Sequence, residues 1–184
     1  MNVSTKEFRE RFELRLVAAN EHLLAAAGDG PDGLAAELGV TVPSGWPEFP
    51  EAIPVTREFL KLFPEQAAWS MYFFIHDPAQ ALVGSGGFKG APLDGMVEIG
   101  YEIAPVWRGQ GAATSAVAAM LDLARESGDV SRVTAQTLPE INESGAVLEK
   151  VGFVRVGGDT DRDVGETWRW ELGWSGTTPG VQGP

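Results

Sequence analysis

The sequence contains no cysteine and only two histidines, His22 and His76. Without cysteine the chain cannot form disulfides, bind zinc through thiolates or use a cysteine nucleophile. Two isolated imidazoles also argue against a histidine-rich metal site and against a serine–histidine hydrolase, because a lone histidine is more often structural than catalytic. We therefore expect a protein without a metal cofactor.

Basic residues are scarce as well. Lys and Arg total 14 against 26 Asp and Glu, which gives a formal net charge of −12 and a sequence pI near 4.5. Nucleic-acid-binding proteins normally carry a clustered basic surface, so a nucleic-acid partner is not expected. An acidic field favours cationic substrates such as amines, although acidity that only confers solubility is the more ordinary explanation.

Long apolar runs are absent too. No stretch approaches the ~20 continuous apolar residues of a membrane span, and the first fifteen residues are strongly charged, unlike a signal peptide. We therefore expect neither a membrane partner nor export, and cytoplasmic location is the default. A length of 184 residues with 43% hydrophobic residues suits one soluble domain, assigned to residues 1–172. The Gly- and Pro-rich tail, residues 173–184, is predicted to be disordered.

Hydrophobic periodicity predicts the elements along the chain. Alternating or apolar runs predict strands at 13–20, 67–77, 79–90, 95–105, 130–138, 153–157 and 166–172. Helical spacing predicts helices at 21–29, 32–39, 55–63, 111–128 and 142–151. Asn20 is the expected N-cap of the first of these, and the segment 41–54 is expected to be an irregular loop that exposes Trp46 and Phe49. This order indicates a mixed sheet flanked by helices.

The segment RGQGAA, residues 108–113, joins a predicted strand to a predicted helix. A helix N-terminus presents unpaired backbone N–H groups and the positive end of the helix dipole, which stabilise an anion. Gly109 and Gly111 would let a pyrophosphate approach these amides, Arg108 adds a charged donor, and Thr114 adds a hydroxyl. On these residues alone, a tight turn without a ligand is an equally good explanation. The segment lacks the Lys-Ser/Thr of a P-loop and the third glycine of a dinucleotide fingerprint.

Four segments together resemble the GNAT superfamily of acyl-CoA-dependent N-acyltransferases. Arg108, Gly111 and Ala113 match its pyrophosphate-binding motif, and NESGAVLEKVGF is similar to its later helix followed by Gly-Phe. LVGSGGFKG and VEIGYEIAP resemble the third and fourth strands of the branch that includes the Rim-type N-terminal alanine acetyltransferases. The resemblance spans residues 13–172.

The resemblance implies the GNAT fold, an α/β (α+β) architecture. Its mixed sheet of six to seven strands is flanked by helices, and strands 4 and 5 splay apart to admit the pantetheine arm of acetyl-CoA. The residues implied to contact acetyl-CoA are Ile103 (through its backbone), Arg108, Gly109, Gln110, Gly111, Ala112, Ala113, Thr114 and Asn142. Asn142 would also serve as a helix N-cap, and both roles can hold together.

The resemblance also nominates catalytic groups for attack of a neutral amine on a thioester. Glu98 is the first choice for general base and Glu102 is the reserve, while Ser144 could donate a hydrogen bond to sulfur or relay a proton. An ion-paired strand glutamate and an ordinary first-turn serine are comparably good explanations of Glu98 and Ser144. Two departures bear on catalysis. Leu148 stands where the family often has a tyrosine, and Gln136 stands where relatives can carry a glutamate base.

Tyr101, on the other face of its strand, is assigned to packing. Trp46 and Phe49 either shape an acceptor pocket or pack over the first helix, and the sequence leaves both open. The expected function is transfer of an acetyl group to a primary amine, on a protein N-terminus or a small molecule. A non-catalytic acyl-CoA-binding domain and transfer of another acyl group are the alternatives. Homodimers are common among such folds, and the sequence does not decide this.

Overall fold

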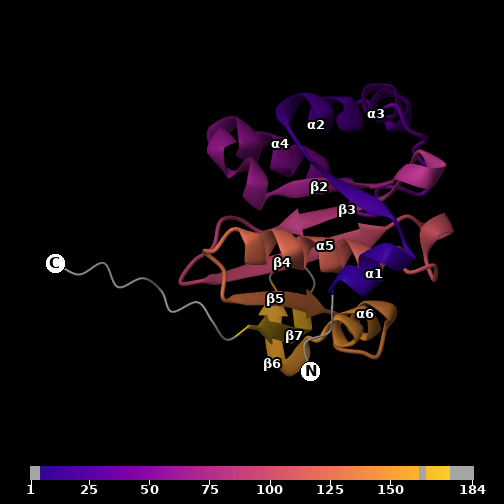
Figure 1. Cartoon of the computed structure of the whole chain (residues 1–184). Coiled ribbons are helices and arrows are strands. Elements are labelled where there is room, and N and C mark those ends of the chain that lie inside the picture. Colours follow the sequence, from indigo (N-terminus) through magenta and orange to yellow (C-terminus); the bar gives the residue numbers. More distant parts are fainter. Residues whose placement is uncertain (1–4, 162–164, 175–184) are drawn as a thin grey trace.

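The computed structural model describes residues 5–161 and 165–174, and in these residues seven strands form one mixed sheet (Figure 1). The strands are β1 Leu14–Ala18, β2 Met71–His76, β3 Ala81–Phe88, β4 Met96–Ile103, β5 Arg132–Thr137, β6 Val154–Asp161 and β7 Gly165–Gly173. Their spatial order is β1-β2-β3-β4-β5-β7-β6. The β4–β5 pair is parallel and the other neighbouring pairs are antiparallel, so the expected mixed sheet is confirmed.

Helices cover the two faces of this sheet. They are α1 Thr5–Arg11, α2 Glu21–Gly28, α3 Pro31–Leu38, α4 Ala52–Leu62, α5 Ala112–Glu126 and α6 Glu143–Val151. Figure 1 shows α1 and α5 in front of the middle strands and α6 near β5 and β7, whereas α2, α3 and α4 gather near β2. The predicted N-cap is confirmed, because the Asn20 side chain accepts from the Leu23 N–H. Gly39 and Gly152 end α3 and α6 in the left-handed conformation.

Two hydrophobic clusters divide the strand side chains by face. In β4, Val97, Ile99 and Ile103 are buried against the small and apolar side of α5. In β2, Phe73 and Ile75 face the opposite way and are buried under α2, α3 and α4. The alternating residues of β4, including Glu98 and Glu102, therefore lie on the α2–α4 face of the sheet. No helix covers that face beside β5 and β7 in the part of the chain that the structure describes.

Several boundaries differ from the sequence-based predictions. Residues 5–11 form α1, for which the sequence analysis predicted no element. The predicted strand at 67–77 begins only at Met71, because residues 64–69 form a 3₁₀ helix. The loop predicted at 41–54 ends early, since α4 begins at Ala52.

The C-terminal boundary also differs. Gly173 is the last residue of β7, and the Trp174 indole after it donates to the Val130 carbonyl at 3.0 Å, so the folded part of the chain extends past residue 172. The rest of the tail predicted to be disordered, residues 175–184, lies outside the described residues.

The sheet opens between β4 and β5. Their pairing runs from Met96 opposite Arg132 to Ile99 opposite Ala135, although β4 continues to Ile103 and β5 to Thr137. The predicted splay between the fourth and fifth strands is therefore confirmed. Beyond Ile99, β4 keeps its ladder with β3 only.

Glycine makes the β3–β4 contact on this free length of β4 close. A Cβ atom at Gly84 would lie 2.2 Å from the Glu102 carbonyl oxygen, and one at Gly86 would lie 2.4 Å from the Gly100 carbonyl oxygen. Larger residues there would push β4 toward the β4–β5 opening, so the two glycines fix the position of the strand that lines one side of this opening.

Among the described helices, none is long and apolar enough to cross a membrane.

Candidate functional site

The loop between β4 and α5 exposes the backbone amides at the start of α5. Gly109 (φ 73°) and Gly111 (φ 97°) are both in the left-handed region that disfavours side chains. Gly111 is the N-cap of α5 and supplies no side-chain cap, and a Cβ atom at Gly109 would meet no atom within 4 Å. Residues 109–111 are exposed, and the first N–H groups of the 15-residue helix have no intrahelical acceptor, so an anion placed there would complete their hydrogen bonding.

The remaining loop residues support this arrangement from inside. Ala112 and Thr114 are both buried. Ser115, also buried, donates from its hydroxyl to the Phe12 carbonyl at 2.8 Å. The Gln110 amide donates to the Val106 carbonyl at 2.8 Å. Of the predicted phosphate contacts, residues 109–111 are therefore exposed, whereas Ala112 and Thr114 are buried and the Gln110 amide is bonded within its own loop.

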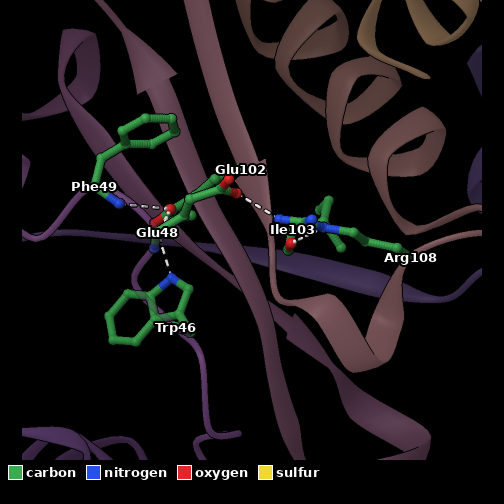
Figure 2. Close-up of polar contacts among 7 residues, drawn as sticks. Trp46, Glu48, Phe49, Glu102, Ile103 and Arg108 are labelled. Atoms are coloured by element: carbon green, nitrogen blue, oxygen red, sulfur yellow. Dashed lines mark hydrogen bonds and ion pairs between the residues drawn. The ribbon is translucent and has the colours of Figure 1, made fainter. Parts of the chain in front are cut away.

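Arg108 connects this loop to the irregular segment before α4 (Figure 2). Its Nε donates to the Ile103 carbonyl at 2.9 Å, and its guanidinium forms an ion pair with the Glu48 carboxylate. Both Glu48 and Phe49 donate their backbone N–H to Glu102 Oε2, at 2.7 and 3.2 Å. We call residues 46–49 the 46–49 loop. Arg108 and Glu102 hold it against the free length of β4.

Trp46 anchors the same loop to β3. Its indole N–H donates to Ser85 Oγ at 3.1 Å, and Ser85 in turn donates to Glu102 Oε1 at 2.7 Å. Trp46 is only 6% exposed, so the prediction that it is exposed was wrong, whereas Phe49 is 52% exposed. The indole is buried because it packs with Phe73 under α2–α4. With both of its oxygens accepting hydrogen bonds, Glu102 is placed to position this loop.

Glu98 lies in a polar hollow on the uncovered part of the α2–α4 face. The hollow has a volume of about 140 Å³ and is lined by Met96, Val97, Glu98, Thr134, Gln136, Asp159 and Arg169. Glu98 Oε1 is shielded from solvent, and the Lys89 ammonium approaches it to 2.5 Å without hydrogen-bond geometry, so the contact is an ion pair. Gln136 accepts a hydrogen bond from the Thr167 hydroxyl at 2.9 Å. Glu98 is thus the carboxylate of this hollow next to the opening of the sheet.

Tyr101 and Ser144 meet on the opposite face. The Tyr101 hydroxyl donates to the Ser144 carbonyl at 3.3 Å, which links the free length of β4 to the first turn of α6. Burial raises the pKa of Tyr101 to about 12, with the Ser144 contact opposing this, so the phenol stays protonated at neutral pH. Asn142 caps α6 by accepting from the Gly145 N–H at 2.8 Å. Leu148 is buried in the core, whereas the Ser144 side chain is exposed.

Two comparisons with known sequences bear on this arrangement. The model of the acetyltransferase (GNAT) domain matches residues 37–154. An uncharacterized N-acetyltransferase of Bacillus subtilis, YjdG, is 32% identical over 148 residues, covering 79% of this chain and 88% of that protein. The chain belongs to the GNAT acetyltransferase family. It is therefore an acyltransferase, as the sequence analysis predicted.

Solved GNAT structures share the fold. The ribosomal L7/L12 α-N-protein acetyltransferase RimL in complex with coenzyme A has a TM-score of 0.63 at 22% identity, covering 87% of this chain and 93% of that one. A spermidine N-acetyltransferase SpeG chimera from Vibrio cholerae and hSSAT has a TM-score of 0.65 at 16% identity, covering 88% and 95%. At these identities the likeness extends to the fold alone.

The GNAT fold distributes the predicted site residues over the two faces of the sheet. Glu98 and Glu102 lie on one face, whereas Ser144 and Asn142 lie on α6 at the other, and the opening between β4 and β5 separates them. Sequence reasoning did not identify Lys89 or Glu48 as site residues. Glu48 is placed by its loop's contact with Arg108, sixty positions away, whereas Lys89 is placed by the β3–β4 pairing, and its position after a glycine-rich strand could have suggested it.

Replacement of Glu102 by alanine tests the positioning role. Because Glu102→Ala removes the acceptor of the Ser85 hydroxyl and of two backbone amides, we expect the free energy of unfolding to fall by about 2 kcal/mol. Urea denaturation measures this loss, and limited proteolysis within the 46–49 loop should become faster. Glu98→Ala is the control, since it breaks one half-exposed ion pair on the same strand. Equal stability of the two variants would contradict the role assigned to Glu102.

Proposed function

We propose that this GNAT protein transfers an acetyl group from acetyl-CoA to a primary amine. The observation that carries the proposal is that an anion-binding helix end and a paired carboxylate lie around the same opening, between β4 and β5. Free helix amides lie at one end of the β4–β5 opening, and a carboxylate beside an ammonium lies on the far face. An acyl donor with a diphosphate and a long thin arm fits the first part, and an amine fits the second.

The donor is assigned to the α5–α6 side of the sheet. Its diphosphate would be held by the backbone amides of residues 109–114, where the helix dipole adds to the hydrogen bonds. The arm would follow the free length of β4, whose peptide groups beyond Ile99 lack a β5 partner, and Asn142 and Ser144 would line its other side. Arg108 contributes by the loop geometry that its bond to the Ile103 carbonyl maintains.

Glu98 is proposed as the general base. The carboxylate takes a proton from the acceptor ammonium, and the neutral amine nitrogen attacks the thioester carbonyl. A C–N bond forms as the C–S bond breaks, and the departing thiolate takes up one proton. On the α5–α6 side of the sheet, where the thiolate would leave, the Ser144 hydroxyl and the protonated Tyr101 phenol are the available hydrogen-bond donors.

The acceptor is proposed to be cationic. RimL is named for acetylating a ribosomal protein and SpeG for acetylating spermidine, so both protein N-termini and small amines serve relatives of this fold. The net charge of −12 attracts a cationic amine over a longer range than the contacts within the hollow do. Leu148 and Gln136 favour a second candidate, an acyl-CoA-binding domain without turnover.

Release of free CoA separates these candidates. With acetyl-CoA and a panel of peptides, polyamines and small primary amines, an acetyltransferase should release CoA with at least one amine. Calorimetric titration with CoA measures donor binding independently of turnover. Tight CoA binding without release across the panel would favour the binding domain, and absence of CoA binding would overturn both. Other acyl-CoAs in the same assay test the choice of acyl group.

A further inference from the structure

Lys89 directs its ammonium into the site from the end of β3. Its backbone N–H donates to the Glu98 carbonyl at 2.9 Å, which fixes it beside β4. Its stem crosses Gly100, since a Cβ atom built there would lie 3.8 Å from Lys89 Cε. The ammonium then reaches Glu98 Oε1 at 2.5 Å. This is an ordinary van der Waals separation, so the stem packs over β4 at position 100.

The position of Gly100 shows where the Lys89 stem lies relative to the opening between β4 and β5. The last β4–β5 pair is Ile99 opposite Ala135, so Gly100 is the first residue of β4 at the opening of the sheet. The Lys89 stem therefore lies at the mouth of the opening, and its ammonium contacts the carboxylate assigned as base. A primary amine of the chain itself thus occupies the place proposed for the acceptor.

We propose that Lys89 is an intramolecular acceptor, and that the protein acetylates this lysine at its own active site when no external amine is bound. The proposal rests on the proposed function. Glu98 takes a proton from the Lys89 ammonium, and the Nζ lone pair attacks the thioester carbonyl. The N–C bond forms, the C–S bond breaks, and the thiolate takes up a proton to leave as CoA. The balance is one acetyl-lysine, one CoA thiol and one proton released.

The other lysines of the chain lack this setting. The sequence contains four lysines in all. Lys6, whose side chain is 81% exposed, pairs with Glu10 on α1, and Lys61 pairs with Glu58 on α4. Lys150 lies over the Phe8 ring at 5.7 Å. Unassisted acetylation in solution favours the most accessible amines, which predicts Lys6 before Lys89, whose side chain is 55% exposed.

Acetylation would also change the site. An acetyl-lysine carries no charge, so its ion pair with Glu98 would be lost and Oε1 would be uncovered. The geometry further indicates the acceptor class, because Glu98 already pairs with a primary ammonium on an unbranched alkyl stem. External amines of this shape should compete with Lys89 for Glu98 and slow its acetylation.

Mass spectrometry on the full-length protein tests the proposal. After incubation with acetyl-CoA and no amine, peptide mapping should find Lys89 acetylated about tenfold or more faster than Lys6, because proximity replaces a bimolecular encounter. The rate constant should not depend on protein concentration. Lys89→Arg should abolish this fast acetylation and leave that of Lys6, Lys61 and Lys150 unchanged.

Two glutamate variants serve as the matched pair. Glu98→Gln should slow acetylation of Lys89 about 100-fold, as expected for loss of a general base. Glu171→Gln changes a carboxylate on β7 that is similarly part-buried and ion-paired, and should have no effect. Acetylation of Lys89 at the rate of Lys6, insensitivity to Glu98→Gln, or a rate proportional to protein concentration would overturn the proposal. If CoA is released with external amines in that case, the proposed function stands; without CoA binding, both fall.

Discussion

Glu98→Gln is expected to lower kcat for an external amine by about 100-fold to 10,000-fold, because glutamine cannot accept a proton at neutral pH. Glu98 is the carboxylate that lies both in the polar hollow and one residue pair from the end of the β4–β5 ladder. The amides that would bind the donor lie beyond the end of β4, at the start of α5. CoA affinity should therefore remain within about twofold of the parent protein, well below the tenfold change that 1.4 kcal/mol produces.

Steady-state turnover and calorimetric CoA binding check the two halves of this expectation. Glu171→Gln is again the control, since Thr134 pairs with both Glu98 and Glu171 and so places the two glutamates in one row across the sheet. Unchanged kcat in Glu98→Gln would remove Glu98 from the mechanism. A parallel loss of CoA affinity would instead indicate that the substitution disturbs the opening of the sheet.

The elements that sequence patterning predicted well are those that bury one apolar face. The helical spacing of α5 and the period-two pattern of β4 both report burial against the same core. By contrast, α1 buries no residue fully: Phe8 packs only partly against the core, and polar contacts add to it. Thr5 and Arg9 contact Asp122 at 2.7 and 3.0 Å, which no hydrophobic pattern encodes.

The candidate site likewise contains one part that the sequence predicts and another that only the structure shows. The loop before α5 is local: two glycines at a strand–helix junction predict, from a few consecutive residues, a helix start without a side-chain cap. The contacts of Glu102 and Arg108 with the 46–49 loop join residues more than fifty positions apart, so they depend on sheet register and loop path. This is why Glu102 could be named from the sequence as a candidate base, whereas its hydrogen bonds could be found only in the structure.

Gly109→Ala is expected to weaken CoA binding by about 100-fold while the protein stays folded. A Cβ atom at Gly109 would meet nothing in the protein, so the methyl group would extend into the space proposed for the diphosphate. Displacement of the diphosphate from one or two amides costs about 1.5–3 kcal/mol for each hydrogen bond to a charged group. The left-handed backbone at Gly109 adds about 1–2 kcal/mol of strain to the folded state.

Gly128→Ala isolates the strain from the binding effect. Gly128, after the end of α5, has φ 76° against 73° at Gly109, and its Cβ atom would also meet no atom within 4 Å. The two variants should thus lose equal free energy of unfolding in urea, and only Gly109→Ala should lose affinity in calorimetric titration with CoA. Equal CoA affinity in both variants would mean that the amides after Gly109 do not hold the diphosphate. Equal affinity loss in both would mean that strain propagates through α5, because the two glycines flank opposite ends of that helix.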